Sequence, residues 1–301
     1  MNKIKVKNMT DSLSIIIPAL NEQDNIYKLL KGIEESFSDI KNLEVVLVDD
    51  GSDVELENFI DIQDLKLKLV IIRNSYNQGQ SRSIEVGLKS SNGNVIGLID
   101  GDLQNPPGQL KKLYDFYLVN EFDGIVSYRK NRKDEIYRKI ISKIANLLLK
   151  IFTKSKFKDL GSSIKIIKRE CLESVVFKGD MHRFISPMLE ARGYNLHELE
   201  VEHAERTMGE SKYGVERIVP VLVDGVLFYL TNGFTRPSKY AVGKLSFILL
   251  IISFLLNCLV IYQKLFNTVF VHRNPLFVIA MVFLLLSIQV FSQIVKINEH
   301  E

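Results

Sequence analysis

The chain has 301 residues, of which 46% are hydrophobic and 25% are charged, and its formal net charge at pH 7 is +3. This length allows one large domain or two modest ones, and a net charge this small gives no reason to expect nucleic acid as a partner. The two cysteines, Cys171 and Cys258, are far apart in the sequence. Neither a disulfide framework nor a cysteine-ligated metal site is therefore expected.

Apolar strands and amphipathic helices alternate through the first 120 residues. The pattern predicts strands at residues 13–17, 43–48, 67–72 and 95–99, and Pro18 is expected to stop the first of them. It predicts three helices. The first is opened by Asn21-Glu22, the second reaches about Ser90, and the third runs from Pro107 to about Asn120. This alternation is typical of an α/β fold whose mostly parallel sheet is covered on both faces and binds ligands at the carboxyl ends of its strands.

The pattern is weaker between residues 120 and 240. It predicts short strands at 124–127 and 164–167, a helix at 181–192, a basic amphipathic helix at 134–153, and a long apolar stripe at 215–230. An amphipathic helix with a cationic face can lie on a membrane surface, although a core-facing helix with a solvated back has the same pattern. We expect residues 215–230 to form an interfacial helix.

Two long uncharged segments lie near the C-terminus. No charged residue occurs between Lys244 and Lys264, or between Arg273 and Lys296. Each segment is long enough to cross a hydrocarbon core about 30 Å thick. The sequence therefore predicts a hairpin of two membrane-spanning helices, at about residues 245–263 and 275–295. Their few polar residues, such as Ser253 and Ser287, are expected to face the partner helix.

The charges beside these segments predict an orientation. Basic residues flank the outer ends of the hairpin at Arg236, Lys239, Lys244 and Lys296, against Lys264 and Arg273 in its loop. This bias favours a cytoplasmic main domain. The Lys-rich N-terminus carries no signal-type cleavage pattern, which agrees. We expect a multi-pass cell-membrane protein with two spans and its main domain facing the cytoplasm.

Two carboxylates, Asp100 and Asp102, follow the predicted buried strand at 95–99. Such a pair at the mouth of a strand suits a hard divalent cation such as Mg²⁺ or Mn²⁺, which prefers oxygen ligands and is completed by substrate phosphates. The alternative is a pair of solvated aspartates in a turn. The same edge of the sheet is expected to carry Pro18 and the pair Asp49-Asp50.

Four motifs occur in a defined order along residues 11–214. They are Ser14-Ile-Ile-Ile-Pro18 with Asn21-Glu22, Val48-Asp-Asp-Gly-Ser52, Asp100-Gly-Asp-Leu-Gln-Asn-Pro-Pro107, and Glu205-Arg206 with Gly209-Glu-Ser-Lys-Tyr213. In these motifs the chain resembles the family 2, GT-A-type glycosyltransferases, and within them the polyprenyl-phosphate sugar synthases typified by dolichol-phosphate mannose synthase and undecaprenyl-phosphate glucosyltransferase. The resemblance implies a GT-A-type Rossmann-like sheet with flanking helices, followed by the two-helix transmembrane hairpin.

The resemblance assigns donor-site roles. Asp49 and Asp50 are expected beside the nucleoside, where carboxylates accept hydrogen bonds. Asp100, Asp102 and Gln104 are expected to hold the Mg²⁺ or Mn²⁺ ion that neutralises the diphosphate leaving group. The other predicted residues of the nucleotide-sugar site are Pro18, Asn21 and Glu22. Arg206 and Lys212 are expected on a loop that closes over the diphosphate, and together with Asp102 they are the predicted catalytic residues. An ordinary basic surface loop is the alternative for Arg206 and Lys212.

The acceptor site follows from the same resemblance. A lipid phosphate is already an anion, so transfer to it needs cations that position it more than a general base. Arg129, Arg138 and Ser142 match the expected phosphate-binding positions, since the guanidinium fork suits phosphate oxygens. The alternative for the arginines is a solvated or phospholipid-facing charge.

Three positions depart from this pattern or stand outside it. Asp159 precedes Gly-Ser-Ser where many relatives carry an aromatic-basic group, which leaves the sugar pocket undefined. His182 opens a helix expected near the sugar site, and His203 precedes the loop bearing Arg206. Single histidines outside a cluster are more often structural than catalytic.

The sequence thus predicts an inverting enzyme that moves one hexose-type sugar from a UDP- or GDP-linked donor to a polyprenyl phosphate, undecaprenyl or dolichyl. Its expected parts are a catalytic domain at residues 1–214, juxtamembrane amphipathic helices at 215–243 and the hairpin at 244–301. A homo-oligomer through the hairpin or residues 215–230 is compatible with this layout. The alternatives are a family 2 transferase with a saccharide acceptor and a non-catalytic membrane scaffold of the same fold.

Overall fold

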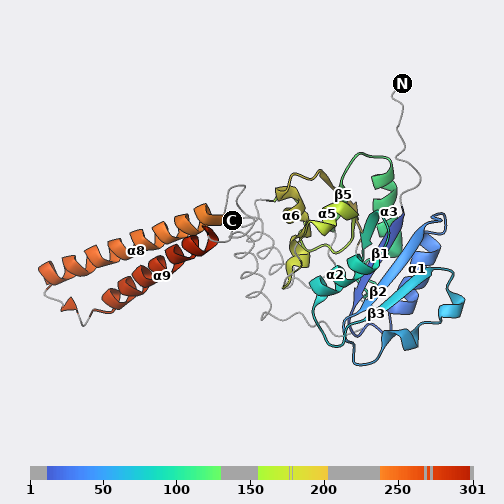
Figure 1. Ribbon diagram of the computed structural model, residues 1–301, viewed down its shortest axis with the longest axis horizontal. Coiled ribbons are helices and arrows are strands. Elements are labelled where there is room, and N and C mark those ends of the chain that lie inside the picture. The colour runs from blue at the N-terminus through green and yellow to red at the C-terminus, as the bar shows by residue number, and fades with distance from the viewer. Residues whose placement is uncertain are drawn as a thin grey trace, which may run out of the picture. The chain divides into compact units, whose positions relative to one another are not determined.

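The chain divides into two compact units, Met1–Val226 and Leu227–Glu301 (Figure 1). The computed structural model describes residues 12–129, 155–175, 177, 179–202, 238–267, 270–271 and 274–298. The helices predicted at 134–153 and 215–230 lie outside these residues. So do the predicted site residues Arg138, Ser142, Arg206 and Lys212, and His203.

A seven-stranded mixed sheet forms the centre of the first unit, in the order β3-β2-β1-β4-β6-β5-β7. The strands are β1 (Leu13–Ala19), β2 (Leu43–Asp49), β3 (Lys68–Arg73), β4 (Val95–Leu98), β5 (Gly124–Arg129), β6 (Lys165–Lys168) and β7 (Leu196–Val201). All neighbours pair in parallel except β6, which runs antiparallel to both β4 and β5. The predicted α/β fold with a mostly parallel sheet is confirmed.

Helices cover both faces of this sheet (Figure 1). The helices of the first unit are α1 (Ile26–Ser36), α2 (Gln80–Ser90), α3 (Pro107–Leu118), α5 (Arg169–Glu173) and α6 (Ile185–Ala191), with the short 3₁₀ turns η1 (Leu56–Phe59), η2 (Ile62–Asp64) and η3 (Met181–Phe184). The helices α1 and α3 pack together on one face, and α2 packs on β1 and β2.

The alternation of side chains along β1 explains the two packed faces. Ile15 and Ile17 are fully buried in the cluster that holds the apolar sides of α1 and α3. Ile16 points to the other face, where a Cβ on Gly87 of α2 would stand 2.4 Å from its Cγ2. A strand buried on both faces must be apolar throughout, and α2 approaches it closely only because residue 87 is glycine.

Pro18 does not stop β1, contrary to the prediction. The strand continues to Ala19, and Pro18 lies opposite Val48 of β2. On the other side of β1, its pairing with β4 ends where Leu98 lies opposite Ile16. A proline, which lacks an N–H donor, is tolerated where one side of the strand has no ladder to complete.

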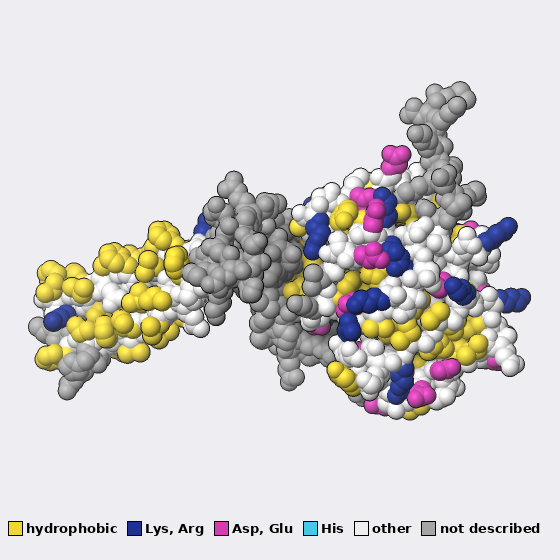
Figure 2. Space-filling model, in the orientation of Figure 1, with side chains coloured by type: hydrophobic (Ala, Val, Ile, Leu, Met, Phe, Trp, Pro, Cys, Tyr) yellow, Lys and Arg dark blue, Asp and Glu magenta, His cyan; other side chains and the backbone are white. Residues whose placement is uncertain are grey.

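The second unit contains an antiparallel pair of long helices, α8 (Ser238–Asn267) and α9 (Pro275–Asn298). Segments Gly243–Phe266 and Pro275–Ser292 are long and apolar enough to span a membrane, and most of their residues are not buried. Figure 2 shows hydrophobic side chains over the outer surface of this hairpin. Unlike the core helices of a soluble protein, these two keep their apolar surface outward.

Serine hydroxyls join the two long helices. Ser246 and Ser287 each donate to the other's carbonyl oxygen, at 3.0 and 2.9 Å, and Ser253 donates to the carbonyl of Ala280 at 2.8 Å. Ser253 and Ser287 therefore face the partner helix, as predicted. Small polar residues at such an interface let the backbones approach and satisfy their hydroxyls away from lipid.

Glu44 ties together the amino-terminal ends of the strands. Its carboxylate accepts hydrogen bonds from Ser14 of β1 at 2.9 Å, from Lys68 of β3 at 2.7 Å, and from the backbone of Asn92 at 2.8 Å. Burial by itself raises the pKa of Glu44, but the bonds from Lys68, Asn92 and Ser14 outweigh it and lower the pKa to about 2. Glu44 is thus a structural carboxylate, and it lies at the opposite edge of the sheet from Asp100.

Glu44→Gln is expected to lower the free energy of unfolding by about 1–3 kcal/mol at pH 7, because charged hydrogen bonds are lost inside the protein. A lowered carboxyl pKa stabilises the fold above its unfolded value and loses that effect as the pH falls. The difference from wild type should therefore shrink between pH 4.5 and 2. Thermal unfolding followed by circular dichroism measures it. The exposed Glu57→Gln is the control, and equal unfolding temperatures of Glu44→Gln and wild type at pH 7 would contradict this role.

Candidate active site

The first two predicted motifs meet at the carboxyl ends of β1 and β2. The backbone N–H of Asp50 donates to the carbonyl of Ala19 at 2.8 Å, and that of Asn21 donates to Ser52 Oγ at 2.9 Å. The Asn21 side chain also exchanges two hydrogen bonds with Asp53, at 3.0 and 2.9 Å. Asn21 has a φ of 56°, a left-handed conformation that asparagine adopts more readily than most residues. Asn21 therefore forms the corner that holds the two loops together.

Glu22 follows this corner, in the turn before α1, which begins at Ile26 and not at the predicted Asn21-Glu22. Its Oε2 accepts a hydrogen bond from Asn25 Nδ2 at 2.8 Å, and its carbonyl accepts from the backbone of Ile26 at 2.9 Å. The predicted nucleotide-site residues Pro18, Asn21 and Glu22 are thus gathered at the expected edge. Their contacts in this structure are with the protein, and their binding to a nucleotide sugar stays a prediction.

Asp49 is buried, and its carboxylate accepts hydrogen bonds from the segment that follows it and from the end of β3. It accepts from the backbone of Ser52 at 2.9 Å, from the backbone of Leu56 at 3.3 Å and from Arg73 at 3.2 Å. The same guanidinium donates to the carbonyl of Ser52 at 2.9 Å. Asp49 therefore shapes the loop after β2.

Asp50 is also buried, and it holds the loop that leads into α2. Its carboxylate accepts from Asn74 Nδ2 at 2.7 Å, and from the backbones of Gln78 and Gly79 at 3.0 and 2.8 Å. Gly51 follows with a φ of 73°, and a Cβ there would stand 2.6 Å from the backbone of Tyr76. The loop can cross so closely only over a glycine. Contact of Asp49 and Asp50 with a nucleoside stays a prediction.

The acidic pair follows β4 as predicted. The Asp100 Oδ1 accepts a hydrogen bond from Gln80 Nε2 at 2.7 Å, and Asp102 Oδ1 accepts from the backbone of Gln104 at 3.1 Å. Leu103, between them, has a φ of 59° and packs against the hydrophobic core. This conformation costs a bulky residue roughly 1–3 kcal/mol, so the packing of Leu103 fixes a strained turn that carries both acids.

The charge on Asp100 depends on its surroundings. Burial and the Asp102 carboxylate raise the pKa of Asp100 to about 6, while a hydrogen bond from Ser163 and the positive charges of Lys165 and Arg129 act to lower it. Two close carboxylates disfavour each other's ionisation. The cations are therefore needed to keep the pair ionised near neutral pH.

Lys165 is a buried member of the site that the sequence reasoning missed. It is 4% exposed, lies opposite Leu98 at the end of β4, and donates to the carbonyl of Ser162. Burial lowers the pKa of Lys165 to about 8, although Asp100 and Asp159 act to raise it. Because β6 is antiparallel, its first residue reaches the edge where the parallel strands end. In the sequence, the signal that could have indicated Lys165 is a lysine at the start of a predicted apolar strand.

Arg129, predicted to bind the acceptor phosphate, ends β5 at the same edge. Its Nε and Nη2 donate to the two oxygens of Asp159, at 2.7 and 3.1 Å, and both side chains are largely buried. Such a bidentate pair fixes the plane of the guanidinium. Asp159, which precedes the Gly-Ser-Ser segment that departs from the family pattern, is thus the partner of Arg129.

Asn105 extends the polar cluster behind the acidic pair. Its Nδ2 donates to Ser163 Oγ at 3.0 Å, and Ser163 in turn bonds Asp100. Among the described residues, Asn105 Oδ1 is the one side-chain nitrogen or oxygen that is sealed from solvent without a hydrogen-bond partner. An unsatisfied buried group costs about 1–3 kcal/mol, and such groups recur at functional sites.

The donor set fits a hard divalent cation. Asp100 and Asp102 offer carboxylate oxygens and Gln104 an amide oxygen, the ligands that Mg²⁺ and Mn²⁺ prefer. No group of three or more His, Cys, Asp or Glu side chains that could hold a metal occurs within the described ranges. Two carboxylates match the arrangement in which substrate phosphates complete the coordination.

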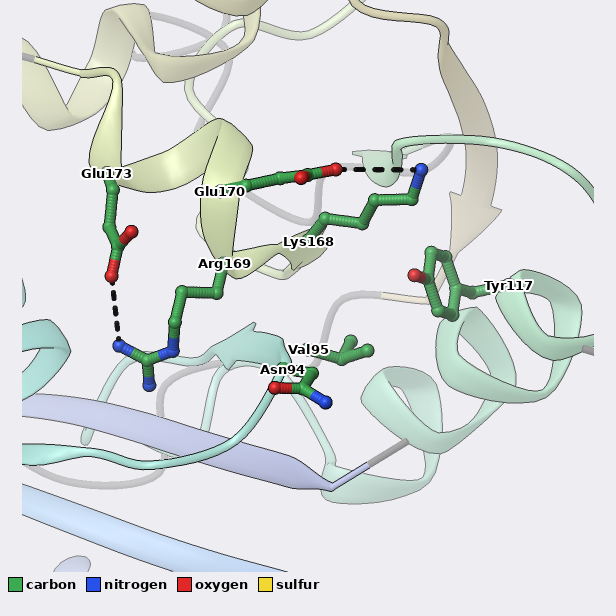
Figure 3. Close-up of a pocket in the computed structure, with 7 residues that line it drawn as sticks. All are labelled: Asn94, Val95, Tyr117, Lys168, Arg169, Glu170 and Glu173. Atoms are coloured by element: carbon green, nitrogen blue, oxygen red, sulfur yellow. Dashed lines mark hydrogen bonds and ion pairs between the residues drawn. The ribbon is translucent and has the colours of Figure 1, made fainter. Parts of the chain in front are cut away.

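A cavity of about 350 Å³ lies elsewhere, at the amino-terminal end of β4. Figure 3 shows Arg169 beside Asn94 there, with ion pairs from Arg169 to Glu173 and from Lys168 to Glu170. Arg169 also donates to the carbonyls of Gly93 and Leu88. Arg169 thus holds the end of α2. None of the predicted site residues lines this cavity.

Comparison with known proteins agrees with this geometry. The family model described as glycosyl transferase family 2 matches residues 14–176, more than half of the chain. The chain belongs to glycosyltransferase family 2. The family resemblance read from the four motifs is therefore confirmed, and the protein is a glycosyltransferase.

The transferase has curated relatives over most of its length. It is 30% identical to dodecaprenyl-phosphate galacturonate synthase of Rhizobium johnstonii over 290 residues, which cover 93% of this chain and 85% of that one. It is also 30% identical to undecaprenyl-phosphate 4-deoxy-4-formamido-L-arabinose transferase of Aeromonas hydrophila, with 73% and 68% covered. Both relatives are polyprenyl-phosphate sugar transferases by name.

Solved structures resemble the transferase in fold. Glucosyl-3-phosphoglycerate synthase from Mycobacterium tuberculosis, in complex with Mn²⁺, UDP and glucosyl-3-phosphoglycerate, superposes with a TM-score of 0.56. The match covers 75% of this chain and 82% of that one at 16% identity. This neighbour confirms the GT-A-type fold.

In the transferase, Asp50→Asn is expected to loosen the segment from Asn74 to Gln80. The new amide nitrogen replaces one of the two carboxylate oxygens and cannot accept the backbone N–H group bound there, so the free energy of unfolding should fall by about 1–3 kcal/mol. Activity should fall at least tenfold, since Gln80 then loses its position beside Asp100. Thermal unfolding and initial rates measure the two effects. The exposed Asp39→Asn is the control, and wild-type values for Asp50→Asn would contradict the role of Asp50.

Proposed function

We propose that the transferase moves one sugar from a nucleotide diphosphate sugar, UDP- or GDP-linked, to a polyprenyl phosphate such as undecaprenyl or dolichyl phosphate. The observation that carries the proposal is that the acidic pair at the carboxyl edge belongs to a chain that also has an apolar two-helix hairpin. The first suits a diphosphate donor with its metal, and the second suits a lipid acceptor. The names of the curated relatives support the same pairing.

The donor site would use the residues gathered at the ends of β1, β2 and β4. Asp100, Asp102 and Gln104 would hold Mg²⁺ or Mn²⁺, and the bound ion would neutralise charge on the departing diphosphate. Asp49 and Asp50 would stand on the nucleoside side. Arg206 and Lys212 would approach the diphosphate from their loop and exclude water.

The acceptor reaction needs little acid-base chemistry. A lipid phosphate oxygen is already anionic, so it attacks the anomeric carbon once it is positioned and its charge is matched. Arg129, Arg138 and Ser142 would receive the phosphate, and Arg129 would use the guanidinium N–H groups that do not bind Asp159. A single displacement of this kind inverts the anomeric centre.

The membrane setting follows from the hairpin. We propose that α8 and α9 span the cell membrane and that the catalytic domain, residues 1–214, faces the cytoplasm. Residues 215–243 would form the juxtamembrane connection to the hairpin at 244–301. This arrangement would keep the catalytic domain close to the headgroups from which the lipid phosphate is taken.

Asp102→Ala is expected to reduce transfer at least 100-fold while the protein still folds and inserts, because one of the two carboxylates is lost. The measurement is the donor-dependent formation of radiolabelled, chloroform-soluble lipid by washed membranes supplied with Mg²⁺ or Mn²⁺. Asp115→Ala, an exposed aspartate on α3, is the matched control and should retain wild-type rates. Near-normal turnover by Asp102→Ala would refute the assignment of the acidic pair.

A further inference from the structure

His182 is held against the start of α2 by two hydrogen bonds to one side chain. The Ser81 hydroxyl accepts the backbone N–H of His182 at 2.9 Å and lies 3.0 Å from His182 Nδ1. Ser81 is 2% exposed. The imidazole is therefore fixed in orientation by a buried partner from a distant part of the chain.

These contacts favour one tautomer of the ring, because a buried hydroxyl proton without an acceptor costs free energy. The Ser81 hydroxyl has one proton, and its oxygen is already used as an acceptor by the backbone of His182. Within the described part of the chain, Nδ1 of His182 is the acceptor left for that proton. The second ring nitrogen, Nε2, then carries the hydrogen of a neutral imidazole.

The ring is neutral at physiological pH. Burial lowers the pKa of His182 to about 3, and the positive charges of Arg183 and Lys165 act in the same direction. An imidazole of this kind is a weak base and carries no charge. What it offers is a single N–H donor in a fixed direction, the form in which a neutral histidine serves as an electrophile in other enzymes.

The Nε2 donor is open to a ligand. No described residue accepts a hydrogen bond from it. His182 is half-buried, and Nε2 is not among the fully sealed, unpartnered side-chain atoms of the described residues, so it keeps some access to solvent. An N–H group that is fixed, unpartnered and reachable is suited to bind an acceptor oxygen of a substrate.

The position of His182 relates it to the acidic pair. Gln80, next to Ser81 in the chain, donates to Asp100 at 2.7 Å, and the charge of Lys165 acts on both Asp100 and His182. In the sheet order, β2 with the predicted nucleoside residues lies on one side of β4, and β6 with Lys165 lies on the other. A donor laid along this edge, with its diphosphate at β4, would place its sugar on the side of Lys165 and His182.

We propose that His182 binds the donor sugar, donating its Nε2–H to a sugar oxygen. This inference rests on the proposed function, since it takes the donor to be a nucleotide sugar. A site that binds a substrate hydroxyl through a directed donor discriminates against sugars that lack it. His182 is therefore a residue of sugar specificity, with Ser81 as its positioning partner.

The test compares His182→Phe, which keeps a ring but has no donor, with His182→Gln, which retains an N–H. The purified full chain in detergent is assayed with the nucleotide sugar that wild type uses fastest in a panel of UDP- and GDP-linked sugars. We expect kcat/KM for the donor to fall roughly 10- to 100-fold in His182→Phe and to recover in large part in His182→Gln. Binding of the product nucleoside diphosphate with Mn²⁺, followed by calorimetry, should be unchanged in both variants.

A series of deoxy donors identifies the contact. With wild type, the donor that lacks the bound hydroxyl should have a kcat/KM lowered by the same factor as His182→Phe lowers it for the complete donor. With His182→Phe, removal of that hydroxyl should lower kcat/KM no further. His197→Phe is the matched control, because His197 of β7 stacks against Phe116 and Phe122, and it should retain wild-type kinetics.

Two results would overturn the inference. One is a His182→Phe variant with wild-type kcat/KM for the donor. The other is a loss of nucleoside diphosphate binding as large as the loss of kcat/KM, which would make His182 a structural residue. Failure of the proposed function has a different signature, because wild type itself would then transfer no sugar from any donor of the panel.

Discussion

Two carboxylates at the end of one buried strand repel each other, and the candidate site is arranged around that repulsion. Asp100 and Asp102 are accompanied by the buried cations Lys165 and Arg129, while Asp159 fixes Arg129 in place. Three carboxylates against two cations leave this cluster short of positive charge. A divalent cation would more than offset this deficit, and it would bring with it a preference for phosphate oxygens.

The remaining polar contacts make this arrangement rigid. Asn21 joins the loops after β1 and β2, and Asp50 holds the loop before α2, which in turn places Gln80 on Asp100. Each loop is thus fixed to a strand of a sheet whose two faces are packed. A site built on strands in this way keeps its side chains in place without help from the substrate.

The sequence predicted the acidic edge well because strand direction and turn residues are local signals, which is why Asp100 and Asp102 stand where they were expected. Lys165 was missed because the antiparallel direction of β6 depends on contacts far away in the sequence. Strand β7 was also missed, since the alternating polar residues of Leu196–Val201 carry no long apolar run. Pro18 was expected to end β1, but the strand continues, because β4 pairs with β1 only as far as Ile16 and Pro18 needs no hydrogen bond on that side. No local pattern in the sequence reveals where this pairing stops.

The most direct test of the central claim is a titration of Mn²⁺ with the purified full chain, followed by electron paramagnetic resonance, with and without nucleoside diphosphate. The account predicts one bound Mn²⁺ per chain, tighter binding when the diphosphate is present, and loss of that site when Asp100 and Asp102 are both replaced by asparagine. Equal Mn²⁺ binding by the wild type and this double variant would contradict it.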